Sequence, residues 1–118
     1  MKGMKMSDYQ YEIEMSVRDY ELDLEGIVNN AVYLNYFEHA RHEFLKAVGL
    51  DFSELHKQGT DAVVTRIEVD YRRFLSSGDR FIIKCGLSRK GKLRLIFQQD
   101  LFKLPDNTLA AQAVVTAT

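Results

Sequence analysis

Apolar and polar residues alternate strictly near the start of the chain. Tyr9, Tyr11, Ile13, Met15 and Val17 are separated by Gln10, Glu12, Glu14 and Ser16. A period of two is the pattern of a strand with one buried face. It predicts the first strand at residues 9–17.

The alternation stops at residues 18–30, which hold four acids, one glycine and the pair Asn29-Asn30 and are predicted to form a long loop. Apolar residues then recur at three- and four-residue spacing: Tyr33, Tyr36, Phe37, Ala40, Phe44, Ala47 and Val48. Asn29 or Asn30 can cap this segment, and Gly49 closes it. The pattern predicts one helix of about five turns with a deeply packed aromatic face.

Beyond Thr60 the period returns to two and predicts four strands joined by short turns. The strands are expected around 63–71, 81–87, 93–104 and 109–115, with turns at 76–79, 89–92 and 105–107. A phase slip across residues 98–100 predicts a bulge in the third of these strands. The segment Asp51-Phe52-Ser53-Glu54 has the form of a capping box and predicts a short helical turn ending near Gly59.

The order strand, helix, four strands predicts an α+β fold in one domain spanning residues 1–118, with residues 1–8 flexible. Short turns predict that consecutive strands are antiparallel neighbours. A single helix covers only part of a five-stranded sheet, so an uncovered face or edge is expected to meet another subunit. We therefore expect at least a dimer.

Composition narrows the class of protein. The 118 residues are 46% hydrophobic and 28% charged, which is typical of a soluble globular domain. The formal net charge of −1 gives no overall attraction to nucleic acid. Cys85 is the one cysteine, no apolar stretch is long enough to span a membrane, and the N-terminus lacks an apolar signal core, so a cytoplasmic location is expected.

The loop before the helix is the main candidate for chemistry. Backbone N–H groups of Asn30, Ala31 and Val32 lie at the positive pole of the predicted helix, where an oxyanion is stabilised. Asp23, followed by Gly26, is placed to act on a nearby carbonyl as nucleophile or general base. Asp is also a preferred turn residue, and spacing alone favours a side-chain turn at Asp23.

The segment from Val17 to Arg41, with its core Asp23-Leu24-Glu25-Gly26-Ile27-Val28, resembles the signature of the 4-hydroxybenzoyl-CoA thioesterase-like hotdog family. The likeness continues at Val69–Arg73 and Gly78-Asp79 and covers nearly the whole chain. It implies the hotdog fold, a long helix wrapped by an antiparallel sheet. It also implies a homodimer or homotetramer with the active site between subunits, and no metal or organic cofactor. The implied substrate is a thioester of CoA or acyl carrier protein.

The resemblance implies a role for particular residues. Asp23 becomes the nucleophile or general base, and the amides around Asn30 and Ala31 become the oxyanion donors. The expected substrate-binding residues are Gly26, Ile27, Val28, Tyr33, Arg89 and Lys90. Arg89 and Lys90 are chosen from their own chemistry, as basic residues of a predicted turn that can contact CoA phosphates, although basic residues in turns are more often simply solvated. Many relatives have Tyr-His where this chain has Asn29-Asn30, so no histidine is available there to relay a proton. The Asn-Asn form resembles the branch with plant acyl-lipid and dihydroxynaphthoyl-CoA thioesterases.

Alternatives remain at this point. Related hotdog proteins hydrate or dehydrate acyl thioesters, and a third possibility is a non-catalytic acyl-CoA-binding protein. Metal binding by Glu38, His39, His42 and Glu43 is disfavoured, because catalytic zinc takes three protein ligands and a polar helix face explains these residues. Cys85 is expected to be a small buried thiol. Arg41 is expected to make a structural ion pair or to bind loop carbonyls.

Overall fold

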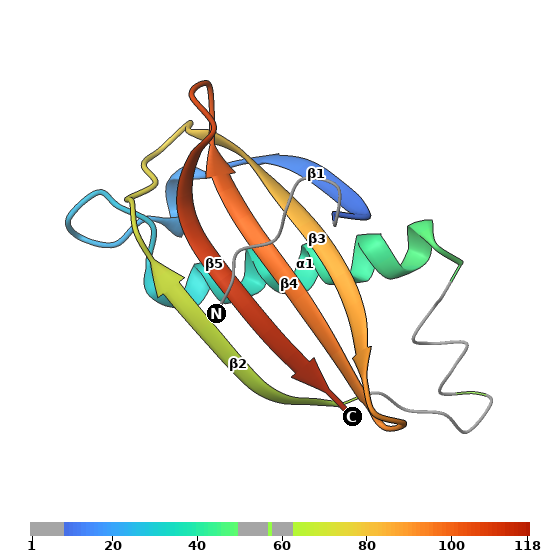
Figure 1. Ribbon diagram of the computed structural model, residues 1–118. Coiled ribbons are helices and arrows are strands. Elements are labelled where there is room, and N and C mark those ends of the chain that lie inside the picture. Colours follow the sequence, from blue (N-terminus) through green and yellow to red (C-terminus); the bar gives the residue numbers. More distant parts are fainter. Residues whose placement is uncertain (1–8, 50–56, 58–62) are drawn as a thin grey trace.

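The computed structural model describes residues 9–49, 57 and 63–118, and in this part of the chain one long helix lies across a five-stranded antiparallel sheet (Figure 1). The elements are β1 (Tyr11–Ser16), a short 3-10 helix (Asp19–Glu21), α1 (Asn30–Ala47), β2 (Val64–Tyr71), β3 (Arg80–Lys90), β4 (Arg94–Lys103) and β5 (Thr108–Ala117). The predicted α+β order is confirmed. Except for Lys57, the turn predicted at residues 51–59 lies outside the described residues, as does the flexibility predicted for residues 1–8.

The strands lie in the order β1-β3-β4-β5-β2. The predicted pairs β3–β4 and β4–β5 are confirmed, but the prediction that β2 neighbours β3 is wrong, because β2 pairs with β5 at the opposite edge. Residues 72–79 carry the chain across the end of the sheet. There the amides of Arg72 and Arg73 donate to the Ala110 carbonyl, and Leu75 is fully buried.

The bulge lies elsewhere than predicted. β4 pairs with β3 without interruption across residues 98–100. The irregularity is in the β4–β5 pair, where Leu101 faces Ala111 and Phe102 faces Leu109, so Ala110 is the extra residue. The apparent phase slip arises because Gln99, a polar residue, occupies a fully buried position in β4.

The core lies between α1 and the facing side of the sheet. α1 buries Tyr33, Tyr36, Phe37, Ala40, Arg41, Phe44 and Leu45. The sheet contributes Phe81, Ile83, Cys85, Phe97, Leu101, Ala111, Ala113 and Val115. Cys85 is a buried thiol, as predicted, whereas Ala47 and Val48 are exposed because the helix ends there.

Arg41 has the structural role expected of it, but with a different partner. Its NH1 donates to Gln99 Oε1 at 3.0 Å, and Gln99 Nε2 donates to the Phe37 carbonyl at 2.9 Å. This network ties the middle of α1 to the middle of β4. Burial lowers the pKa of the Arg41 guanidinium.

The outer side of α1 is polar. Glu38, His39 and His42 are exposed, and Glu43 forms an ion pair with Lys46 at 3.6 Å. Among the described residues, no group of three or more potential metal-ligating side chains is found. No helix in the same part of the chain is both long and apolar enough to cross a membrane.

Candidate active site

The loop between β1 and α1 contains a tight hairpin at residues 21–29. Asn29 N–H donates to the Glu21 carbonyl at 3.3 Å, and Asp23 N–H donates to the Ile27 carbonyl at 2.8 Å. Gly26 N–H closes the turn on the Asp23 carbonyl at 3.1 Å. Gly26 has a φ of 78°, a conformation that favours glycine. Asp23 is therefore the first residue of a defined turn.

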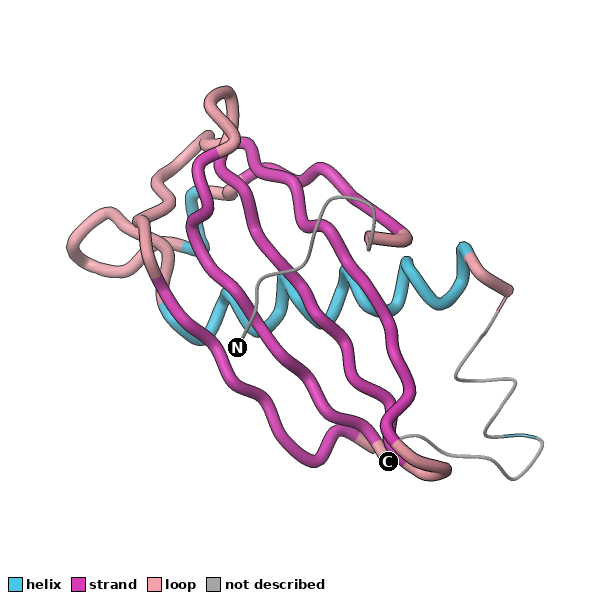
Figure 2. The backbone as a smooth tube through the Cα atoms, in the orientation of Figure 1, coloured by secondary structure: helices cyan, strands magenta, loops and turns pink. Residues whose placement is uncertain are grey.

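The hairpin docks on the end of the sheet. Val28 N–H donates to the Leu75 carbonyl at 2.9 Å, and Ile27 forms a bridge with Ser76. Val28 is 3% exposed, whereas Gly26 is exposed. The loop projects beside the end of β2 (Figure 2). Three of the expected substrate-binding residues, Gly26, Ile27 and Val28, thus share this hairpin with Asp23.

Asp23 itself is exposed and makes a side-chain turn. Its Oδ1 accepts from the Glu25 N–H at 2.8 Å, which is the contact that spacing alone favoured. Among the described residues, none donates a hydrogen bond to Asp23 Oδ2. A carboxylate held through one oxygen still offers the other to an electrophile or to water, so the turn orients Asp23 without excluding chemistry.

The start of α1 narrows the set of oxyanion donors. Asn29, and not Asn30, is the cap, because Asn29 Oδ1 accepts from the Ala31 N–H at 2.9 Å. Val32 N–H donates to the Asn29 carbonyl. Within the described part of the chain, the Asn30 N–H has no acceptor. Asn30 therefore offers the available amide at the positive pole, while the Ala31 amide is occupied by the cap.

Two tyrosines pack beside the helix start. Tyr33 is 3% exposed, and its hydroxyl donates to the Arg73 carbonyl at 3.4 Å, so the expected substrate contact lies in the core of the protomer. The Tyr71 ring stacks edge-on against Tyr33 at 5.1 Å, and its hydroxyl donates to the Asn30 carbonyl at 3.3 Å. Tyr71 is 46% exposed and is not among the residues expected at the site from the sequence. Two signals pointed to it: its position at the end of a predicted strand, and the likeness to the family at Val69–Arg73.

Arg89 and Lys90 lie far from Asp23 in the same protomer. The loop meets β3 at its beginning, where Val17 N–H donates to the Asp79 carbonyl, and Arg89 and Lys90 are at the other end. The ten steps from Arg80 to Lys90, at about 3.3 Å each, span roughly 33 Å. Figure 1 shows the β3–β4 turn at the opposite end of the sheet from the loop.

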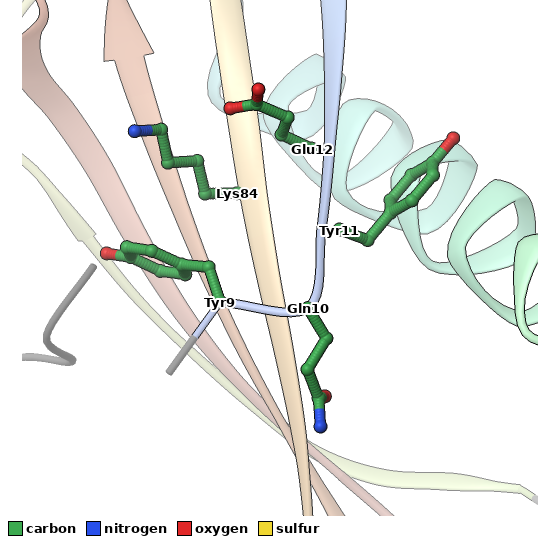
Figure 3. Close-up of a pocket in the computed structure, with 5 residues that line it drawn as sticks. All are labelled: Tyr9, Gln10, Tyr11, Glu12 and Lys84. Atoms are coloured by element: carbon green, nitrogen blue, oxygen red, sulfur yellow. The ribbon is translucent and has the colours of Figure 1, made fainter. Parts of the chain in front are cut away.

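A separate cavity of about 370 Å³ lies at the beginning of β1 (Figure 3). It is lined by Tyr9, Gln10, Tyr11, Glu12 and Lys84. The Lys84 ammonium lies 5.8 Å from the centre of the Tyr9 ring and 5.3 Å from that of Phe102. Because the Asp23 loop follows the end of β1, this cavity is not part of the candidate site.

The fold and this loop define the class of protein. A model of the thioesterase-like superfamily matches residues 17–118, and the chain belongs to this superfamily. Its antiparallel five-stranded sheet with one long helix is the hotdog arrangement, which confirms the predicted fold.

Particular relatives are similar over most of this chain. Acyl-acyl carrier protein thioesterase ATL3, chloroplastic, from Arabidopsis thaliana is 41% identical over 106 residues, covering 90% of this chain and 56% of that protein. Long-chain acyl-CoA thioesterase FadM from Escherichia coli is 30% identical over 105 residues, covering 89% of this chain and 79% of that protein. A hypothetical protein, AQ1494, from Aquifex aeolicus, known from its crystal structure, is 28% identical in sequence. Its structure matches with a TM-score of 0.83 over 90% of this chain and 85% of that chain. The chain spans little more than half the length of the plant protein.

Proposed function

We propose that the protein hydrolyses acyl thioesters of CoA or acyl carrier protein, with Asp23 as nucleophile or general base. The observation that carries the proposal is the hairpin that carries the exposed Asp23 carboxylate and leads directly into the start of α1. Membership of the superfamily supports it, as do the names of the relatives, one an acyl carrier protein thioesterase and one an acyl-CoA thioesterase.

The chemistry needs one carboxylate and one water. As general base, Asp23 takes a proton from water while the water oxygen adds to the thioester carbonyl carbon. The C–S bond then breaks, and the proton passes to the departing thiolate. As nucleophile, Asp23 would displace the thiolate to form a mixed anhydride, which water hydrolyses. Both routes give a free acid and a thiol, and CoA enters as part of the substrate without any further cofactor.

The helix start supports the developing oxyanion. Negative charge accumulates on the carbonyl oxygen as the tetrahedral intermediate forms, and a backbone N–H at a helix N-terminus stabilises it. The Asn30 N–H is the donor that we assign to this task. Residues 18–30 contain no histidine, so this loop supplies the carboxylate without an imidazole partner of its own.

A second copy of the chain is the expected partner of β2. This edge strand exposes apolar side chains at Val64 (42%), Ile67 (40%) and Tyr71 (46%). An unpaired edge of this kind favours strand pairing, and a two-fold axis makes such a contact antiparallel. The beginning of one β2 would then lie beside the end of the partner's β2, where the Asp23 loop of that subunit is.

Charge favours the same pairing. The loop before α1 carries the acids Asp19, Glu21, Asp23 and Glu25 and one base, Arg18, and the opposite end of the sheet carries Arg66, Arg89, Lys90, Lys92 and Arg94. An antiparallel contact along β2 brings the acidic loop of one subunit toward the basic β3–β4 turn of the other. Arg89 and Lys90 would therefore serve the partner's site, which accounts for their distance from Asp23 in one protomer.

Thiol release from a panel of octanoyl-, palmitoyl- and benzoyl-CoA and of acyl carrier protein thioesters tests the function. We expect turnover with at least one substrate, and a fall in kcat of at least about 100-fold in Asp23→Ala, because the base or nucleophile is lost.

Glu25→Ala is the matched control, since it removes an exposed acid from the same turn and should keep kcat within about twofold. Equal turnover by wild type and Asp23→Ala would overturn the proposed role of Asp23. Tight binding of acyl-CoA without thiol release would indicate a binding protein.

A further inference from the structure

Glu21 is an acid of the loop whose side chain is largely buried, with 9% of it accessible, whereas Asp23 and Glu25 are exposed. Its Oε1 accepts from the Tyr36 hydroxyl at 2.8 Å and from the Arg18 N–H at 2.7 Å. Its Oε2 lies 3.6 Å from Arg18 NH1. Removing a carboxylate from water is costly unless hydrogen bonds replace its hydration, and these contacts do so.

The backbone of Glu21 joins the two limbs of the loop. Its carbonyl accepts from the N–H of Asn29, the residue that caps α1. Asp23 follows two residues later on the same limb. One residue therefore holds the limb that carries Asp23 against the start of α1 through its backbone and against the second turn of α1 through its side chain.

Tyr36 gives this contact a fixed position. It is 2% exposed, and its ring lies 4.8 Å from the ring of Phe81 on β3 and 6.1 Å from that of Tyr33. Burial, together with the neighbouring Glu21 carboxylate, raises the pKa of the Tyr36 phenol, so the hydroxyl keeps its proton and donates. The core thus determines where the Glu21 carboxylate, and with it the loop, is held.

We infer that Glu21 and Tyr36 are positioning residues that hold the Asp23 carboxylate in register with the helix start. This inference rests on the proposed function of Asp23. A misplacement of a reacting group by about 1 Å can lower a rate about 100-fold, so an anchor two residues from Asp23 has a direct effect on rate. Neither residue touches the substrate; both act through Asp23.

The test compares Tyr36→Phe, Glu21→Ala and Glu21→Gln. In Tyr36→Phe and Glu21→Ala we expect kcat to fall about tenfold with KM within about twofold, because orientation is lost and binding is not. Glu21→Gln should keep at least half of the wild-type kcat, since its amide oxygen can accept from both Tyr36 and Arg18. Tyr11→Phe, a tyrosine of β1 stacked on Phe44, is the control for removal of a phenolic hydroxyl.

A second measurement separates positioning from folding. In the Asp23→Ala background, Tyr36→Phe should leave the residual rate unchanged, because a residue that acts through Asp23 has nothing left to position. A further drop in the double variant, or no rescue by Glu21→Gln, would mean a merely structural role and overturn the inference. Normal kcat in Tyr36→Phe with a defective Asp23→Ala also overturns it while leaving the proposed function intact. Full activity in Asp23→Ala overturns both.

Discussion

At the scale of single residues, the core of this protein is notable for the polar groups it accepts. Gln99 is fully buried and uses its amide fully, accepting from Arg41 and donating to the Phe37 carbonyl and to Cys85 Sγ at 3.4 Å. Cys85 is fully buried beside it. Burial raises the pKa of the Cys85 thiol to about 11 from its ordinary value of 9.0. The thiol is therefore protonated at neutral pH and is no candidate nucleophile.

This pKa shift predicts a loss of stability in alkaline solution. Between pH 9 and 11 the unfolded thiol ionises and the folded thiol does not, so stability is complete below pH 9 and falls as the pH rises toward 11. The contribution of Cys85 is at most about 2–3 kcal/mol, at about 1.4 kcal/mol per pKa unit. Urea unfolding at several pH values should show a steeper decline of the unfolding free energy in wild type than in Cys85→Ala.

Wild type and Cys85→Ala contain the same tyrosines and lysines, so titration of those groups cancels when the pH dependence of their unfolding free energies is compared. Cys85→Ala also leaves a cavity and will be less stable at every pH, which makes the slope and not the absolute stability the informative quantity. Parallel declines in the two proteins would contradict the assigned pKa.

At the scale of elements, periodicity predicted every strand and α1, because a buried face imposes its period on local sequence. Periodicity failed where the position of a residue or the pairing of a strand depends on residues distant in sequence. Gln99 looked like a break in β4 because its partners lie on α1, and β2 looked like a neighbour of β3 because sequence does not show that residues 72–79 cross the sheet end. In the site, the loop position indicated Asp23. The Glu21–Tyr36 contact was missed because it joins residues fifteen apart through their side chains.

The cap of α1 is an element-level feature that can be tested directly. Asn29→Ala removes the acceptor for the Ala31 N–H and should lower the free energy of unfolding by about 1 kcal/mol in urea titrations. Asn35→Ala, at an exposed position inside the same helix, should be neutral or slightly stabilising because alanine has the higher helix propensity. Equal effects of the two substitutions would argue against Asn29 as the cap.

At the scale of the whole molecule, the acidic loop before α1 and the basic β3–β4 turn are separated by the length of the sheet. The loop holds Asp23, and Arg89 and Lys90 end β3 at the turn. A site that needs both can be assembled only from two subunits. The antiparallel contact proposed for β2 has the geometry to do this, because it places the beginning of each β2 next to the end of the other.

Complementation tests this arrangement. Asp23→Ala and the double variant Arg89→Glu/Lys90→Glu should each be weakly active alone. When equal amounts are unfolded and refolded together, half of the dimers are mixed, and in each of these one site combines Asp23 of one subunit with Arg89 and Lys90 of the other. Activity should return to about one quarter of the wild-type value, since one of two sites is intact in half of the dimers.

The same mixture distinguishes contributions within and between subunits. If Arg89 and Lys90 served the Asp23 of their own chain, a mixed dimer would contain one site without the carboxylate and one without the basic residues, and no activity would return. Ile67→Arg in both partners is the control for the contact itself, because a charge on β2 should prevent pairing and abolish the recovery. Val48→Arg, at a similarly exposed position past the end of α1, should leave it unchanged. Recovery that persists with Ile67→Arg would place the subunit contact on another surface.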